Sequence, residues 1–282
     1  MAPTPLALDD GPPLPKGGYD PDATGDRRAL LANWLTDPRN RLFAKMAVNR
    51  YWSYFLGRGI VQPVDDMRVT NPPSNPELLE ALARDFTAHG YDLKRLIRTI
   101  CTSRAYRLSS RPTALNREDE VFFTHFIPRR QPAEVLLDSI NIAAGTTEKF
   151  PGLPAGTRAI QLPDASVASP FLDTFGRPPR TTSCECERGS EPSLSQALQM
   201  LNGELVNRKV TDANGRVAGL IAAGKTDAQI AEALYLSTLS RPPRASERAI
   251  ALKSLSAATS RRQAAEDLLW ALINTKEFGE VR

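Results

Sequence analysis

The sequence predicts a mainly α protein: a multi-helix globular fold with a long irregular crossover that contains minor β structure. Two observations support this fold class. Apolar residues recur at helical spacing through the first half of the 282-residue chain and again through its last third. Between those regions, residues 146–190 are rich in Pro, Gly, Ser and Thr and show no helical period. A loop of this length inside a compact domain is usually functional or covers the core.

Composition places the chain among ordinary globular proteins. It is 41% hydrophobic and 24% charged, and no apolar run approaches the roughly 20 residues that a membrane span needs. The N-terminus lacks the basic start and apolar core of a signal peptide. The net charge of +4 is spread along the chain, so we do not expect a nucleic-acid partner. Three cysteines form no disulfide framework.

The N-terminal helical half is predicted over residues 26–145. It follows residues 1–25, which are rich in Pro, Gly and Asp and have the composition of an extended arm or linker. A cap at Thr24 or Asp26 opens the first helix of this half, and Gly57 ends the second. The first helix places four apolar residues on one face: Leu30, Leu31, Trp34 and Leu35.

Three later helices of this half have clear start signals. Asn75 is a cap with Pro76 at the first helical position, Asp92 caps the next helix, and Pro132 opens the last. The helix after Asp92 has an apolar stripe of Leu93, Leu96, Ile97 and Ile100. Cys101 lies on that stripe, so we predict a structural role for it as a small buried hydrophobe rather than a ligand.

The C-terminal helical half is predicted over residues 191–282. Its first helix, which starts near Ser193, has leucines at helical spacing: Leu194, Leu198, Leu201 and Leu205. Two later helices begin with capping boxes, Thr226 with Gln229 and Ser260 with Gln263. No flexible linker separates the two halves, so we expect a single domain over 26–282 that shares one core.

Two segments of the crossover alternate like short strands, residues 157–162 and 180–187. The second contains Cys184 and Cys186, which alternation places on the inner face of a half-buried strand with the intervening glutamates outward. Two thiols on one face could instead hold a soft metal. A zinc site takes about four ligands, and the remaining cysteine and two histidines are distant in sequence. A metal site is therefore not favoured.

No catalytic motif is recognisable, so the catalytic residues are unknown. The chain has no G-x-S-x-G and no phosphate-binding loop. The candidate polar site is His125, an acid–base group, with Arg129 and Arg130 beside it to bind an anion. The simpler interpretation is that His125 has a structural role and anchors the loop before the helix. A hydrolase that acts on extracellular polymer, with its site near residues 146–190, remains an alternative function.

Several stretches in order carry a family resemblance: "NRLFAKMAVNRYWSYFLGRGIVQPVDD", "HGYDLKRLIRTICTSRAYRLSS", "PRRQPAEVLLDSI", "FLDTFGRPPRTTSCECER" and "EALYLSTLSRPP". From about residue 26 to its end the chain resembles the planctomycete-specific C-terminal domain of unknown function 1553 (PSD1 type), in the form that carries the SCECER motif. The family has no established activity, so the resemblance assigns no catalytic residue.

The resemblance implies a setting for the domain. Such domains usually close exported proteins that also carry a cytochrome c-like haem domain. We therefore expect no cofactor here, with haem on a separate domain of longer members, and a periplasmic or exported location. The partners would be other domains or proteins of a cytochrome c-linked assembly. The function that follows is a non-enzymatic interaction or scaffold module of a redox-associated protein; a thiolate metal-binding module is a further alternative.

Overall fold

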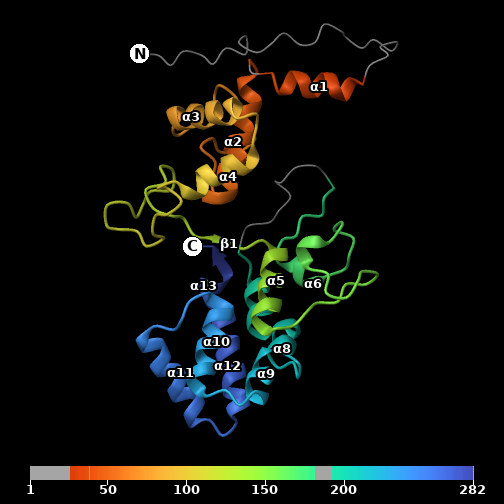
Figure 1. Ribbon diagram of the computed structural model, residues 1–282, viewed down its shortest axis with the longest axis vertical. Coiled ribbons are helices and arrows are strands. Elements are labelled where there is room, and N and C mark those ends of the chain that lie inside the picture. The colour runs from red at the N-terminus through yellow and green to blue at the C-terminus, as the bar shows by residue number, and fades with distance from the viewer. Residues whose placement is uncertain (1–25, 38, 182–191, 282) are drawn as a thin grey trace. The chain divides into compact units, whose positions relative to one another are not determined.

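The computed structural model describes residues 26–37, 39–181 and 192–281, and the contacts between them divide the chain into two compact units (Figure 1). The boundary falls between Pro128 and Arg129. Helices dominate both units, and the described β structure is one pair of two-residue strands. The mainly α fold class is thereby confirmed.

The described residues of the first unit form four helices: α1 (Arg27–Leu35), α2 (Arg41–Leu56), α3 (Pro76–Ala88) and α4 (Leu93–Thr102). The predicted caps are present, because the side chains of Asp26, Asn75 and Asp92 each accept a backbone N–H of the first helical turn. Gly57 ends α2 in the left-handed conformation, at φ 81°. Local side-chain chemistry therefore determines where these helices begin and end.

The core of the first unit lies where α2 packs against α3 and α4. It is built from α2 residues such as Val48 and Trp52, with Phe86 and Ile100 from the other two helices. α1 differs from the other helices of this unit. Leu30 and Leu31, on its predicted apolar face, are about half exposed.

A buried asparagine fixes the loop that follows α2. The Asn49 side chain is fully buried; its Nδ2 donates to the carbonyls of Val61 and Val64, and its Oδ1 accepts the Val61 N–H. Gly59 lies against this side chain, since a Cβ there would come within 3.0 Å of Asn49 Nδ2 and Oδ1, and within 2.3 Å of the Val61 oxygen. Three hydrogen bonds from one side chain thus hold the loop onto α2.

The second unit contains the remaining elements. In chain order these are β1 (Arg129–Arg130), α5 (Ala133–Ala144), the 3-10 helix η2 (Ala159–Gln161), α6 (Pro170–Thr174), α7 (Leu194–Asn202), α8 (Glu204–Val210), α9 (Arg216–Ala222), α10 (Asp227–Leu239), α11 (Ala245–Ala257), α12 (Arg261–Ile273), α13 (Lys276–Gly279) and β2 (Glu280–Val281). The strands pair antiparallel, Arg129 opposite Val281 and Arg130 opposite Glu280.

α5, α10 and α12 form the centre of the second unit (Figure 1). Fully buried side chains from all three meet there: Leu137, Ile140, Ile230, Leu234, Leu269 and Ile273. The sequence predicts α5 as the last helix of the N-terminal half and one core shared by both halves. The described residues instead form two hydrophobic clusters, one in each unit, and α5 belongs to the second because its apolar face packs on α10 and α12.

The crossover contains no strand where residues 157–162 alternate. Residues 159–161 form η2, because the Asp138 carboxylate of α5 accepts the N–H groups of Ala159 and Ile160, and the Gln161 side chain accepts the Arg158 N–H. These local bonds replace the ladder that a strand would need. Most of the other predicted strand, residues 180–187, lies outside the described residues.

Candidate functional site

The three residues of the predicted polar site, His125, Arg129 and Arg130, do not all belong to the same unit. His125 belongs to the first unit, where its ring is half-buried and its Nδ1 has no hydrogen-bond partner among the described residues. Arg129 and Arg130 form β1 of the second unit, and Arg130 Nη1 donates to Gln196 Oε1 at 2.6 Å. The trio therefore stays a prediction, and Arg130 has a structural partner.

Cys101 is half-buried on α4, beside the fully buried Leu96 and Ile100 of the same stripe. Burial raises the pKa of its thiol, which favours the neutral, unreactive form. This setting suits the structural role predicted for it. Cys184 and Cys186 lie outside the described residues, so their facing and the metal alternative remain predictions.

We expect Cys184 and Cys186 to be reduced and free of metal in the folded protein, because the chain supplies too few further ligands. Thiol titration under denaturing conditions should find three free thiols, and protein purified without chelator should contain no stoichiometric zinc or copper. Two results would contradict this: metal that is lost in the Cys184→Ser/Cys186→Ser double mutant, or a single free thiol, which would mean that the pair is oxidised.

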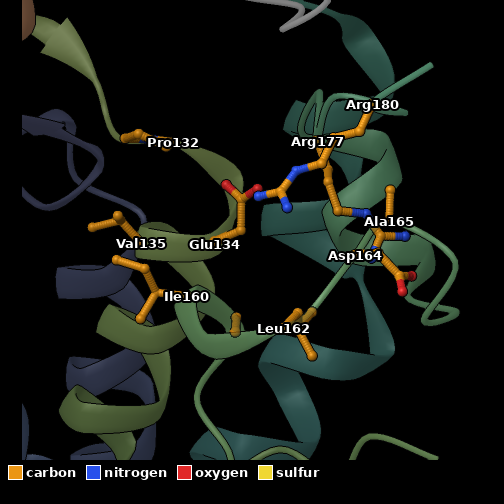
Figure 2. A pocket seen from close by; sticks show the side chains of 10 residues that line it. Pro132, Glu134, Val135, Ile160, Leu162, Asp164, Ala165, Arg177 and Arg180 are labelled. Atoms are coloured by element: carbon orange, nitrogen blue, oxygen red, sulfur yellow. The ribbon is translucent and has the colours of Figure 1, made fainter. Parts of the chain in front are cut away.

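A pocket of about 210 Å³ opens in the crossover region of the second unit, and we call it the crossover pocket. Figure 2 shows Arg177 and Arg180 on one side of it and Glu134 across from them. Its lining comes from the start of α5, from η2 and the residues after it, and from the stretch that follows α6: Pro132, Glu134, Val135, Ala159, Ile160, Leu162, Asp164, Ala165, Arg177 and Arg180. His125, Arg129 and Arg130 are not among these lining residues.

A buried carboxylate holds one wall of the crossover pocket. Asp138 is 3% exposed; it accepts the N–H groups of Ala159 at 2.8 Å and Ile160 at 3.3 Å, and it lies 3.3 Å from Arg158 Nε. Asp138 is not among the site residues predicted from the sequence. The sequence does contain an indication of its role: Asp138 is an acidic residue in the middle of an apolar helix, where a carboxylate requires buried hydrogen-bond partners.

Two charged side chains of the pocket have hydrogen-bond partners within the protein. Arg177 donates to Asp173 Oδ1 from Nε and Nη2, and to the Val167 carbonyl at 2.7 Å from Nη1. Asp164 accepts both the hydroxyl and the N–H of Ser166. These hydrogen bonds lower the pKa of Asp164, and the bond from the Ser166 hydroxyl has the largest effect. This carboxylate is therefore ionised at neutral pH.

A second feature of this unit is the outward-facing apolar side of α7. Leu194, Leu198 and Leu201 are 75%, 50% and 45% exposed, whereas the polar Gln196 is buried. We call the three residues the α7 leucine face. No residue of α7 is charged. The three leucines of this helix therefore depart from the usual amphipathic arrangement, in which apolar residues face the core, whereas Met200 of the same helix packs against the core.

Hydrogen bonds explain why Gln196 rather than a leucine faces inward. Its Oε1 accepts from Arg130 Nη1 at 2.6 Å and from the Ser193 N–H in a capping box, and its Nε2 donates to the Thr174 carbonyl at 3.1 Å. One side chain therefore joins α7 to β1 and to the end of α6. The periodicity located the leucines on one face, but it did not reveal that this face points away from the core.

The described residues contain no group of three or more His, Cys, Asp or Glu side chains that could hold a metal ion. Among the helices that the structure describes, none has both the length and the apolar character to cross a bilayer.

Comparisons with known proteins identify a family but no individual relative. No curated protein and no solved structure matches the chain. The family described as "Protein of unknown function (DUF1553)" matches residues 27–255. The match begins with α1, crosses the boundary between the units and includes the crossover pocket and α7. Because it spans most of the chain, the protein belongs to the DUF1553 family.

Proposed function

We propose that the protein is a non-enzymatic interaction or scaffold module of an exported, cytochrome c-linked assembly, and that the α7 leucine face is its docking surface. The observation that carries this proposal is the exposure of Leu194, Leu198 and Leu201 on a helix without charges. The family resemblance supports the exported setting and the haem-carrying partner.

The energetics of the α7 leucine face favour burial by a partner. Covering an exposed leucine side chain gains about 1.5–3 kcal/mol relative to leaving it in water. A surface that is already rigid loses little conformational entropy when it binds. α7 meets this condition, since Gln196 ties it to Arg130 and Thr174. An apolar surface of a neighbouring domain or protein would cover the three leucines of this face.

The test uses the tagged protein purified from its own cells, with haem absorbance as the readout of a cytochrome c-type partner. We expect a haem protein to copurify in stoichiometric amount with the wild type. Leu198→Glu should reduce it at least tenfold, because a charge at the centre of an apolar interface is left desolvated and unpaired.

Leu115→Glu is the matched control, because Leu115 is 99% exposed, belongs to the first unit and is not part of the α7 leucine face. It should retain the haem protein at the wild-type level. Circular dichroism should show that both variants fold. Equal retention by Leu198→Glu, or no haem protein with the wild type, would contradict the proposal.

The hydrolase alternative rests on the crossover pocket, which lies in the region predicted to hold an active site and has Glu134 and Asp164 in its lining. Its chemistry is less favourable. A general acid needs a pKa near the working pH, and the pKa of Asp164 is lowered. Hydrolysis of an extracellular polymer that Glu134→Gln abolishes would favour this function over the first.

A further inference from the structure

A second pocket of the second unit is lined by residues of α8, of the turn after it and of α12, and we call it the α8–α12 pocket. Its volume is about 300 Å³. The buried side chains of Val210 and Leu269 anchor the two helices in the core. Arg262 of α12 also joins them, because its Nη2 donates to the Thr211 carbonyl at 3.2 Å. The pocket is therefore built on two anchored helices.

Polar side chains of the lining lie along one face of α12. Gln263, Asp267 and Trp270 are four and three residues apart, which places them on the same side of successive helical turns. Asn207 of α8 also lines the pocket. Within the described part of the chain, the side-chain polar atoms of Gln263, Asp267 and Asn207 form no hydrogen bond or ion pair. Two amides and one carboxylate are therefore available to a ligand.

Trp270 gives the pocket an apolar wall. Its side chain is half-buried, since it packs against the core of the second unit and also lines the pocket. None of the described residues accepts a hydrogen bond from its Nε1. The indole therefore offers both an apolar surface and a polar N–H group.

The charges of the lining disfavour an anion as the ligand. Arg262 donates to Glu266 Oε1 at 2.7 Å, so these two charges neutralise each other. The carboxylate of Asp267 then leaves the pocket negative, and it would repel a phosphate or a carboxylate. A neutral ligand with several hydroxyl groups fits better. Its hydroxyls can donate to Asp267, and they can both donate to and accept from the amides of Gln263 and Asn207.

We propose that the α8–α12 pocket binds a pyranose sugar. The C–H face of the sugar ring would lie on the indole of Trp270. The hydroxyls at the ring edge would bond to Asp267, Gln263 and Asn207. An aromatic wall with a few polar groups is typical of small-molecule sites. The volume of about 300 Å³ corresponds to roughly ten water molecules, which is room for one sugar ring.

The sugar could be a free monosaccharide or one residue of a polysaccharide, and isothermal titration calorimetry of the full chain distinguishes the two. We expect at least one of D-glucose, D-galactose and D-mannose to bind at millimolar concentration. The disaccharide of that hexose should bind at least tenfold more tightly if a polysaccharide is the source, and no more tightly if the free sugar is. Both results support a pyranose site, which does not depend on the α7 leucine face.

Two other small molecules test the chemistry of recognition. Cyclohexanol offers a ring of C–H groups but a single hydroxyl, so it should bind at least tenfold more weakly than the hexose. Choline is a cation that could lie on an indole beside a carboxylate. Tighter binding of choline than of every sugar would overturn the proposal, because Asp267 and Trp270 would then form a cation site.

Asp267→Ala is the decisive variant, because Asp267 is exposed and has no partner among the described residues, so the fold should be kept. It should bind the hexose at least tenfold more weakly. Glu232→Ala is the matched control and should bind as the wild type does, since Glu232 is an exposed carboxylate on α10 that does not line the pocket.

Trp270→Leu keeps an apolar side chain toward the core but removes the indole, and it should also weaken binding at least tenfold. Circular dichroism should show that the variants fold, and Asp267→Ala decides if Trp270→Leu does not. Unchanged binding by Asp267→Ala would overturn the proposal. So would a wild-type protein that binds none of the three hexoses or their disaccharides at millimolar concentration.

Discussion

Asn49→Ala should lower the free energy of unfolding of the first unit by about 3 kcal/mol. The substitution removes three hydrogen bonds and leaves the N–H of Val61 and the carbonyls of Val61 and Val64 without the partner that Asn49 gives them. A buried polar group left unsatisfied costs about 1–3 kcal/mol, and water that enters the space recovers part of this. Asn49 itself is fully buried, so a small cavity adds to the loss.

Urea unfolding followed by tryptophan fluorescence measures this effect in a Trp270→Phe background, where the remaining tryptophans, Trp34 and Trp52, both belong to the first unit. Asn207→Ala is the control: Asn207 is exposed on α8 in the second unit, and its replacement should change stability by less than about 0.5 kcal/mol. A loss below about 1 kcal/mol in Asn49→Ala would mean that the loop after α2 holds its conformation without this side chain.

The second large effect is expected at Arg241, which joins the end of α10 to α11 and α13. Its guanidinium donates two hydrogen bonds to Glu247, at 2.7 and 2.9 Å, and two to Glu277 at the same distances. It also lies 5.8 Å from the centre of the Tyr235 ring. Arg241→Met removes the cation that lies between these two carboxylates. All three charged side chains are about a quarter exposed. We therefore expect the free energy of unfolding to fall by about 2 kcal/mol, a value between those typical of surface and of buried ion pairs.

The pH dependence of this loss provides a sharper test. Hydrogen bonds from Arg241 lower the pKa of Glu247 from the ordinary 4.5 to about 2. The stabilisation is therefore complete above about pH 4.5 and is lost as the pH falls toward 2. The difference between wild type and Arg241→Met should shrink over that window. Arg248→Met, on an exposed face of α11, should show no such difference, and a pH-independent loss in Arg241→Met would contradict the ionic explanation.

The sequence predicted those parts of the fold that local chemistry determines. Asp26, Asn75, Asp92 and the Thr226 capping box mark helix starts in the structure, because a cap needs only a side chain and the backbone two or three residues later. Family membership was also predicted, since ordered motifs in the chain carry it.

What the sequence did not predict depends on long-range partners. Residues 157–162 alternate, but they form η2 because Asp138, about 20 positions earlier, captures two of their N–H groups. The outward face of α7 depends on Gln196 meeting Arg130 and Thr174, which are distant in sequence. The crossover pocket likewise combines side chains from residue 132 to residue 180. Periodicity contains no information about such pairings.

The pairing of β1 with β2 has a consequence for how the second unit is connected. Its first residues, Arg129 and Arg130, lie opposite its last, Val281 and Glu280. Paired residues on antiparallel strands are about 5 Å apart, so the chain enters and leaves this unit at one point. A short linker could therefore close this unit into a ring, and new ends could be opened in an exposed loop without separating any of its helices.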